Sequence, residues 1–485
     1  MTIYDITEFG AVGDGVTDNS RAIQAAVDQC SENGGGIVRI PGGSVFLTGP
    51  FDLKSFVNLH LESGAKLLAN PDEEVYTRSA FRKNFQEGSI WIGGEDAEKV
   101  SITGKGTIDG NGISFMGKER KEAFELKPVT DCDPRPHIFT PVRFNNLTIK
   151  DVTFVNAAYW CVHLVGCNDV SIEGIRILNS LKIRNSDGID CDHSRNIRIN
   201  NCYIESGDDC ICMKTRREYE EMGATENIAV SNCIMRSTSC SVKLGSENVD
   251  AIRNVVVSNC IIQGSNRGIG IQNRDEGVIE NILFNNIIIE SRLFDDVWWG
   301  KAEPIYITSY RRETADNKDA RLRFAKGMEK GEAGMIKNIN FQNIICSGEN
   351  GIFVGGNTGK VNNILFDNVQ VTIEKLTTYP GGIYDLRPSD RGIISASTTG
   401  FYILNAGEVK IHNCSLKWGR KRADYFANGI YAENVNGLKI IKFTGSAAFP
   451  GRDKVIRVRN CQNVICEHPE IEPQTNIPGE VLKNE

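Results

Sequence analysis

A repeat of about 20–30 residues constrains this chain more than any other feature of its sequence. A short turn containing Asn or Asp precedes alternating apolar residues, as in Asn196-Ile-Arg-Ile-Asn-Asn-Cys and Asn254-Val-Val-Val-Ser-Asn-Cys. The first apolar residue falls at positions 147, 170, 197, 228, 255, 282, 339 and 364. Strands this short are unstable alone, but stacked coils pair their backbones and bury one apolar column. The repeat therefore predicts a parallel β-helix.

The repeat also decides the expected domain organisation. Chains above roughly 250–300 residues usually divide into domains, whereas a solenoid grows along its axis. We therefore expect one β-helix domain over residues 1–466, followed by a Pro- and Glu-rich tail over residues 467–485. The segment 18–33 begins with Asp18 or Asn19 as N-cap and continues with apolar residues at helical spacing. It predicts a helix that caps the N-terminal end of the solenoid.

Asn and Cys recur at fixed places in the repeat. Asn tolerates left-handed backbone angles and bonds its own turn, so we assign these residues to structure. Cys202, Cys233 and Cys260 occupy one repeat position. We expect them to form an internal ladder of small apolar side chains rather than disulfides.

Charge and composition exclude several classes of protein. The net charge is −7 and the longest basic run is Arg420 to Arg422, so no nucleic-acid partner is expected. No apolar run reaches 18 residues and the N-terminus lacks a secretory signal, so we expect no membrane partner and a cytoplasmic location. Cysteine spacing does not match a zinc site, and no metal or other cofactor is expected. The oligomeric state stays open.

Two acidic motifs lie in consecutive repeats, Asp187-Gly-Ile-Asp and Gly207-Asp-Asp-Cys. Alignment of their strands on Ile189 and Ile211 places Asp187 and Asp209 in one column of adjacent coils, with Asp208 beside them. Neighbouring strands are about 4.8 Å apart, and carboxylates that close raise the pKa of at least one of them. Such a group suits general acid and base work on a glycosidic bond. The alternative is that these acids serve only as turn residues.

The same strand alignment continues through later repeats and places Cys240 and Arg267 in the column of the acids. Lys243 falls in the next outward column. It would either hold a substrate hydroxyl or carboxylate, or pair with Asp190 or Glu247. For Cys240, a core residue and a reactive thiol both stay open.

Five motifs of the chain resemble those of one known protein family. They are Phe9-Gly-Ala-Val-Gly-Asp-Gly-Val-Thr-Asp-Asn, Gly106-Thr-Ile-Asp-Gly-Asn-Gly, Trp160-Cys-Val-His163, Asn185-Ser-Asp-Gly-Ile-Asp190 and Gly207-Asp-Asp-Cys210. Together they resemble glycoside hydrolase family 28, the polygalacturonase family of right-handed parallel β-helices. The resemblance implies an inverting hydrolase in which Asp208 is the general acid and Asp187 and Asp209 activate water.

The chain departs from the pattern of that family at two strands. It has Ser239-Cys240-Ser241 where the family usually has Gly-His-Gly, and Gly270-Ile271-Gln272 where the family has the Arg-Ile-Lys that grips galacturonate. Either Arg267, Arg274 or Lys243 compensates for the missing cations, or the substrate is not plain polygalacturonan. We expect the second.

Other substrate contacts are expected around an inserted loop region over residues 287–335, which would flank the cleft. Trp298, Trp299 and Tyr310 would offer flat faces to sugars there. The alternative is that these rings pack the loop onto the helix body. Gln272 and His163 are further candidate contacts, although His163 is also expected to be a strand residue that bonds backbone.

The sequence therefore predicts a glycosidase that cleaves an α-linked bond at a chain end or in an oligosaccharide. Its partner would be an oligosaccharide or polysaccharide. Two alternatives stay open: a lyase or intramolecular glycosyl transferase on the same scaffold, and a β-helix that binds glycans without catalysis.

Overall fold

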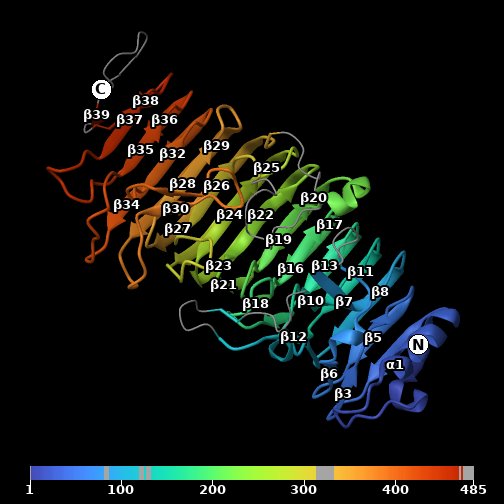
Figure 1. Cartoon of the computed structure of the whole chain (residues 1–485). Coiled ribbons are helices and arrows are strands. Elements are labelled where there is room, and N and C mark those ends of the chain that lie inside the picture. Colours follow the sequence, from blue (N-terminus) through green and yellow to red (C-terminus); the bar gives the residue numbers. More distant parts are fainter. Residues whose placement is uncertain are drawn as a thin grey trace. The chain divides into compact units, whose positions relative to one another are not determined.

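The computed structural model describes residues 2–80, 87–119, 125–126, 133–312, 332–468 and 471–472. These residues fall into two compact units, one up to Met235 and one from Arg236 onward. Figure 1 labels helices and strands of both units. Within the described part of the chain, we find no helix with the length and apolar character needed to cross a membrane.

Parallel strands from successive coils build two sheets in the first unit. One sheet contains β1 (Ile3–Asp5), β2 (Gly36–Ile40), β3 (Val45–Thr48), β5 (Val57–Leu61), β6 (Lys66–Ala69), β8 (Glu98–Gly104), β9 (Thr107–Asp109), β11 (Asn145–Lys150), β12 (Thr153–Val155), β14 (Asn168–Glu173), β15 (Arg176–Leu178), β17 (Arg195–Asn200), β18 (Tyr203–Ser206) and β20 (Thr225–Ser231). The other contains β4 (Phe51–Asp52), β7 (Glu87–Gly93), β10 (Asp133–Phe139), β13 (Val162–Val165), β16 (Ile189–Asp192) and β19 (Ile211–Thr215). The unit boundary falls within β21 (Ile234–Ser237).

The second unit repeats this arrangement. One sheet contains β23 (Ile252–Ser265), β25 (Ile279–Ser291), β27 (Ile336–Gly348), β29 (Val361–Ile373), β33 (Val409–His412), β34 (Ser415–Trp418), β36 (Leu438–Ile441) and β38 (Ile465–Cys466). The other contains β22 (Cys240–Asn248), β24 (Arg267–Asn273), β26 (Ile305–Ser309), β28 (Ile352–Gly356), β32 (Phe401–Leu404), β35 (Ile430–Glu433), β37 (Ile456–Arg459) and β39 (Ile471–Glu472). A separate antiparallel hairpin joins β30 (Ile383–Asp385) and β31 (Ile393–Ser395).

The repeat positions predicted from the sequence lie in register. Leu147 pairs with Val170, which pairs with Ile197 in the next coil of the first unit. In the second unit, Ile282 pairs with Ile339, so the long spacing between them is one enlarged coil. Each unit is thus a stretch of right-handed parallel β-helix, as expected. A single domain over residues 1–466 stays a prediction.

Asn ladders explain why the repeat keeps an Asn at its turns. Asn338 has a φ of 59°, in the left-handed region that few residues other than Asn and Gly adopt. Its Nδ2 donates to Oδ1 of Asn281 at 3.1 Å, and its own Oδ1 accepts from Asn363 at 2.8 Å. The ladder therefore links successive coils through side chains as well as backbone.

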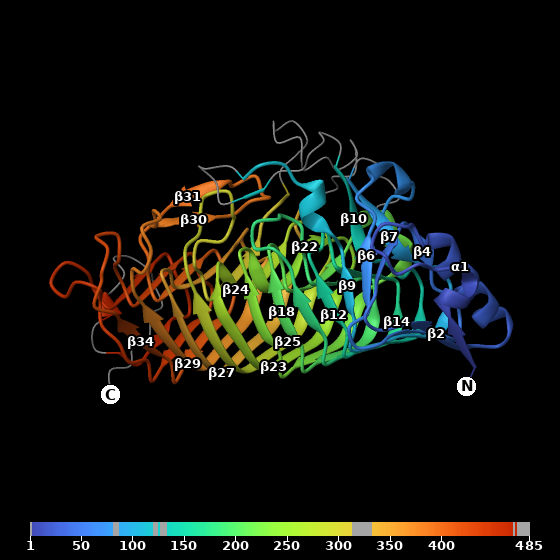
Figure 2. The same cartoon turned by 90° about the horizontal axis from the view of Figure 1, so that it is seen from below.

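A helix covers the N-terminal end of the first unit, as predicted. Figure 2 shows helix α1 (Ser20–Glu32) at the N-terminal end of the first unit. The helix follows Asn19 and buries Ile23, Ala26 and Val27 among other residues. The Oδ1 of Asp18 accepts from the backbone N–H of Ser20 at 2.8 Å. Short 3₁₀ helices also occur: η1 (Ile6–Phe9), η2 (Glu73–Val75), η3 (Gly112–Phe115) and η4 (Arg217–Met222).

Three other expectations concern particular segments. Fourteen cysteines in the described residues are free and buried, including Cys202, Cys233 and Cys260, for which no disulfides were expected. The inserted region over residues 287–335 is not one loop, because it contains the end of β25 and all of β26, and residues 313–331 lie outside the described part. Most of the predicted tail, residues 469–470 and 473–485, also lies outside it.

Candidate active site

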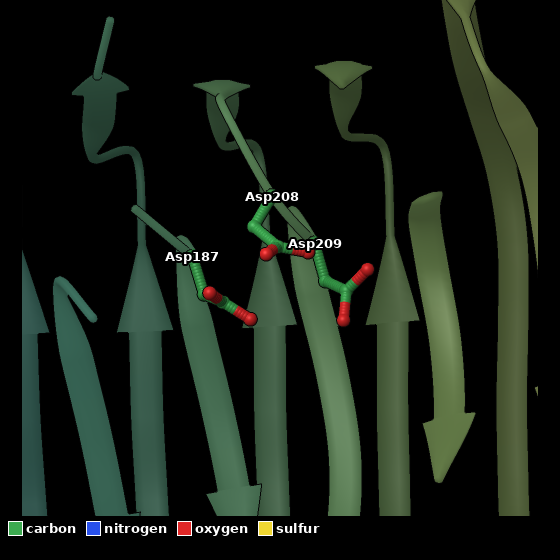
Figure 3. Close-up of side chains that lie close together, drawn as sticks. All are labelled: Asp187, Asp208 and Asp209. Atoms are coloured by element: carbon green, nitrogen blue, oxygen red, sulfur yellow. The ribbon is translucent and has the colours of Figure 1, made fainter. Parts of the chain in front are cut away.

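Three carboxylates converge at the start of two neighbouring strands of the first unit. Asp187 lies just before β16, and Asp208 and Asp209 lie just before β19. Ile189 pairs with Ile211, the register that the sequence predicted. One carboxylate oxygen from each of the three side chains lies within 4.8 Å of the others. Figure 3 shows the three side chains side by side on adjacent coils.

Glycine lets these coils approach closely. The backbone N–H of Gly188 donates to the carbonyl oxygen of Asp209 at 2.8 Å. A Cβ at Gly188 would lie 2.3 Å from the carbonyl oxygen of Cys210, which no side chain tolerates. The Asp-Gly-Ile motif therefore sets the contact between the two acidic turns.

The three acids differ in their exposure to solvent. Asp187 and Asp209 are 3% and 1% exposed, whereas Asp208 is half-buried. The Oδ2 of Asp208 accepts a hydrogen bond from the backbone N–H of Asn185 at 3.1 Å. Among the described residues, Oδ1 of Asp187 has no hydrogen-bond partner. Asp208 is thus the carboxyl group most accessible to a ligand.

Burial dominates the electrostatics of the cluster. It raises the pKa of Asp187 well above its ordinary value, and the charges of Asp190, Asp208 and Asp209 raise it further, while Lys214 lowers it. The carboxyl group of Asp187 therefore keeps its proton to a higher pH than an ordinary aspartic acid does. A group that both holds and accepts protons is suited to acid and base chemistry.

A buried ion pair between the two strands that follow the acids was not predicted from the sequence. The Nζ of Lys214 is 2.8 Å from Oδ1 of Asp190 and 3.7 Å from the centroid of the Trp160 ring. Burial raises the pKa of Asp190 to about 7, although Lys214 opposes this shift. The sequence did offer one signal for this pair. The strand register places Lys214 opposite Asp192 of the preceding coil, two positions after Asp190.

His163 lies on β13 and is fully buried. Its Nε2 is 3.2 Å from Oδ2 of Asp192, a carboxylate contact that the sequence did not predict. Burial lowers the pKa of His163 despite that carboxylate, which favours a neutral ring. This position gives His163 no exposed surface for a substrate.

The candidate arginines belong to the second unit and bond to the protein itself. Arg267 is buried, with its Nε 3.2 Å from Glu303 and its Nη2 2.8 Å from the carbonyl oxygen of Asp385. Arg274 is buried too, and its Nη2 donates to Thr308 Oγ1 at 2.9 Å and to Leu386 O at 3.1 Å. Neither guanidinium is exposed, so the expectation that they grip substrate finds no support here.

The other candidates on β22 and β24 have mixed surroundings. Cys240 is buried, and its Sγ lies 3.2 Å from the carbonyl oxygen of Val242, as expected for a core residue. Lys243 is half-buried. Gln272 is buried, and its Oε1 has no hydrogen-bond partner in the described residues.

Of the aromatic candidates, Trp299 alone is half-exposed, with the Arg387 guanidinium 5.6 Å from its ring centroid. Trp298 and Tyr310 are buried, and Tyr310 packs in a cluster with Tyr306 and Phe353. For Trp298 and Tyr310 the structure therefore agrees with the alternative in which the rings pack the loop.

The three acids are also close enough to surround a cation. Such a grouping does not by itself show a bound ion, and we assign no metal to this site.

Comparison with known proteins gives a consistent set of relatives. The profile of "Glycosyl hydrolases family 28" matches residues 30–294. A "Probable polygalacturonase" of Vitis vinifera is 33% identical over 260 residues, which cover 50% of this chain and 51% of that protein. An "Exopolygalacturonase" of Zea mays is 28% identical over 211 residues, which cover 43% and 48%. The chain therefore spans about half the length of these relatives.

Solved structures extend the similarity to the fold of nearly the whole chain. The family 28 exopolygalacturonase of Yersinia enterocolitica superposes with a TM-score of 0.67 at 18% identity, over 97% of this chain and 79% of that one. At this identity the likeness concerns the fold alone.

Proposed function

The chain belongs to glycosyl hydrolases family 28, and on this premise we propose that it hydrolyses an α-linked glycosidic bond with Asp187, Asp208 and Asp209. The observation that carries the proposal is the convergence of these three carboxylates from adjacent coils within 4.8 Å. A set of turn residues without chemistry would have no reason to bury two of the three acids.

Each acid has a role in the proposal. Asp208 is the general acid, because its half-buried carboxyl group is the most accessible one and can meet the leaving oxygen. Asp187 and Asp209 together position and deprotonate the attacking water. In this proposal Asp208 gives a proton to the leaving oxygen, and Asp187 or Asp209 takes the proton that the attacking water loses.

We also propose that hydrolysis inverts the configuration at the anomeric carbon. Most inverting enzymes keep their two carboxyl groups about 6.5–9.5 Å apart, and most retaining enzymes about 5–5.5 Å. In this site, one carboxylate oxygen from each of the three acids lies within 4.8 Å of the others, which is closer than either spacing. In the proposal, the attacking water therefore lies beside Asp187 and Asp209 rather than between two distant acids. Proton NMR of the first product decides: a β-anomer released from an α-linked substrate supports inversion, and an α-anomer contradicts it.

We further propose a substrate other than plain polygalacturonan, cleaved at a chain end or as an oligosaccharide. Gln272 stands where a cation would grip a galacturonate, and Arg267 and Arg274 are buried in contacts with the protein. Relatives named exopolygalacturonases favour action at a chain end. The cytoplasmic location, which stays a prediction, would also favour short substrates.

A panel of oligosaccharides tests the proposed activity. It should contain oligogalacturonate, its methyl ester, a xylose-substituted galacturonan and neutral α-linked oligosaccharides, with release of reducing ends as the readout. We expect the highest kcat/KM on an esterified, substituted or neutral substrate. Best activity on plain oligogalacturonate would contradict the substrate proposal, and no cleavage of any substrate would contradict the enzyme.

A further inference from the structure

A single peptide group beside the acid cluster is held at both of its ends. It joins Arg184 to Asn185, in the turn that leads to Asp187. Its N–H, which belongs to Asn185, donates to Oδ2 of Asp208 at 3.1 Å. Its carbonyl oxygen, which belongs to Arg184, accepts from Nη1 of Arg135 at 2.8 Å. The guanidinium of Arg135 and the carboxyl group of Asp208 therefore bond opposite ends of one peptide group.

Arg135 comes from a distant coil of the same unit. It lies on β10, and the strands of the sheet follow the order β10, β13, β16 and β19, so Arg135 is two coils away from the strand that follows Asp187. Its side chain is buried, with the guanidinium carbon 4.7 Å from the centroid of the Tyr159 ring. Nη1 also donates to the carbonyl oxygen of Ala158 at 2.9 Å, and Nη2 lies 3.4 Å from Oδ1 of Asn185. These contacts hold the guanidinium in one orientation.

A peptide group transmits a constraint from one of its ends to the other. The group between Arg184 and Asn185 is planar and trans, so its C=O and N–H point in opposite directions. A bond that fixes the direction of the oxygen thereby fixes the direction of the N–H. A charged donor on the oxygen also polarises the group, which strengthens the hydrogen bond that the N–H donates. The N–H of Asn185 is thus directed at Asp208 by a charge on the far side of the peptide group.

We propose that Arg135 is a positioning residue, which orients the carboxyl group of Asp208 through the peptide group between Arg184 and Asn185. The inference rests on the proposed function, because it adds to the general acid assigned there. Arg135 acts through the N–H of Asn185 rather than on the substrate. With Oδ2 held by that N–H, the carboxyl group keeps one orientation toward the leaving oxygen.

The rest of the turn is held by other groups, which makes the effect of Arg135 separable. Nδ2 of Asn179 donates to the carbonyl oxygen of Ser186 at 2.9 Å. The backbone N–H of Ile189 donates to a carbonyl oxygen of the next coil at 2.9 Å. Loss of Arg135 should therefore loosen the N–H of Asn185 and leave that of Ile189 protected.

Amide hydrogen exchange of the free protein tests this link without any substrate. Mass spectrometry with fragmentation to single residues follows the N–H of Asn185. Its exchange should accelerate about tenfold in Arg135→Met and in Asp208→Ala, which corresponds to about 1.4 kcal/mol of lost hydrogen bonding. In the double variant the two effects should not multiply, because both changes remove the same bond.

Two further variants sharpen this measurement. Arg135→Lys keeps the charge without the planar fork, so its exchange rate at Asn185 should fall between those of the wild type and Arg135→Met. The lysine variant also carries the test if the methionine variant does not fold. Arg176→Met is the matched control, because the Arg176 guanidinium also lies over a tyrosine ring of this unit, 5.6 Å from the centroid of Tyr203. It should leave the exchange of Asn185 unchanged.

Turnover tests the role of Arg135 in the reaction. On the best substrate of the panel, Arg135→Met should lower kcat by about tenfold or more with little change in KM, because it displaces the proton donor and not the substrate. Added to Asp208→Asn, the same change should lower kcat by less than about twofold, since no proton donor is left to orient.

The outcomes separate this inference from the proposed function. Faster exchange at Asn185 alone, together with no further loss of kcat in the Asp208→Asn background, supports the inference. Equal acceleration at Ile189 overturns it and assigns Arg135 to the fold alone. An equal loss of kcat with and without the carboxyl group of Asp208 also overturns it, as does exchange at Asn185 that Asp208→Ala leaves unchanged. If no glycan is cleaved, the proposed function fails, and the exchange rates still support or overturn the link between Arg135 and Asp208.

Discussion

At the scale of single residues, Asp187 is the clearest case of an ionisable side chain that is buried although burial removes the water that would solvate its charge. Its carboxyl group is buried beside three other acids, and burial is the main reason for its raised pKa. Such a group binds a proton more tightly in the folded protein than in the unfolded chain. It therefore destabilises the fold as the pH rises above the pKa of the unfolded state, about 3.9.

Asp187→Asn should make this cost visible. The variant is expected to gain stability over the wild type as the pH rises from about 3 to 8, with the smallest difference near pH 3, where the carboxyl group is mostly protonated in both the folded and the unfolded state. Calorimetric melting temperatures across this range measure the effect. A difference in melting temperature that stays constant with pH would contradict the raised pKa of Asp187.

The positions of single residues could be predicted from the sequence where the repeat fixes the register of the strands. Ile189 and Ile211 mark equivalent points of consecutive coils, so the column of acids could be predicted before the structure. Lys214 was missed because its partner Asp190 lies diagonally across the two strands rather than directly opposite. No spacing along the chain distinguishes a diagonal contact from two separate surface charges.

At the scale of the elements, the Asn ladders tie the coils together where the strands turn. Asn338 contributes both a left-handed backbone and two ladder hydrogen bonds. Asn338→Ala should lower the free energy of unfolding by about 1–3 kcal/mol, because Ala strains the backbone and loses both bonds.

Asn338→Gly separates these two causes. It loses the same hydrogen bonds but adopts the left-handed angle freely, so it should be less destabilising than Ala by about 1 kcal/mol. Urea unfolding of both variants measures the difference. A glycine variant that is no more stable than the alanine variant would contradict the account of the turn.

The roles of other elements could not be predicted because they depend on distant segments. Arg267 at the start of β24 and Arg274 just after its end were expected to contact the substrate, yet they bond the carbonyl oxygens of Asp385 and Leu386, more than 100 positions later in the chain. The loop aromatics show the same limit. Trp298 is buried and Trp299 is half-exposed, although both are tryptophans and they are adjacent in the sequence.

At the scale of the whole molecule, one repeat explains the fold class and one departure from the repeat explains the site. The apolar positions that recur every 20–30 residues predicted the parallel β-helix, because they leave each strand dependent on its neighbours. The acidic turns before β16 and β19 interrupt the apolar pattern at two consecutive coils. Consecutive coils are adjacent in space, so this interruption placed the acids together.

The activity of Asp208→Asn is the measurement that tests this account most directly. On the best substrate of the panel, we expect kcat to fall by a factor of about 10²–10⁴ with an unchanged melting temperature, since the variant removes the proton donor alone. Asp169→Asn is the matched control, because Asp169 is an exposed acid of the same unit that pairs with Arg198 at 2.6 Å, and it should keep full activity. Near-full activity of the Asp208 variant would contradict the assignment of the acid cluster as the catalytic site.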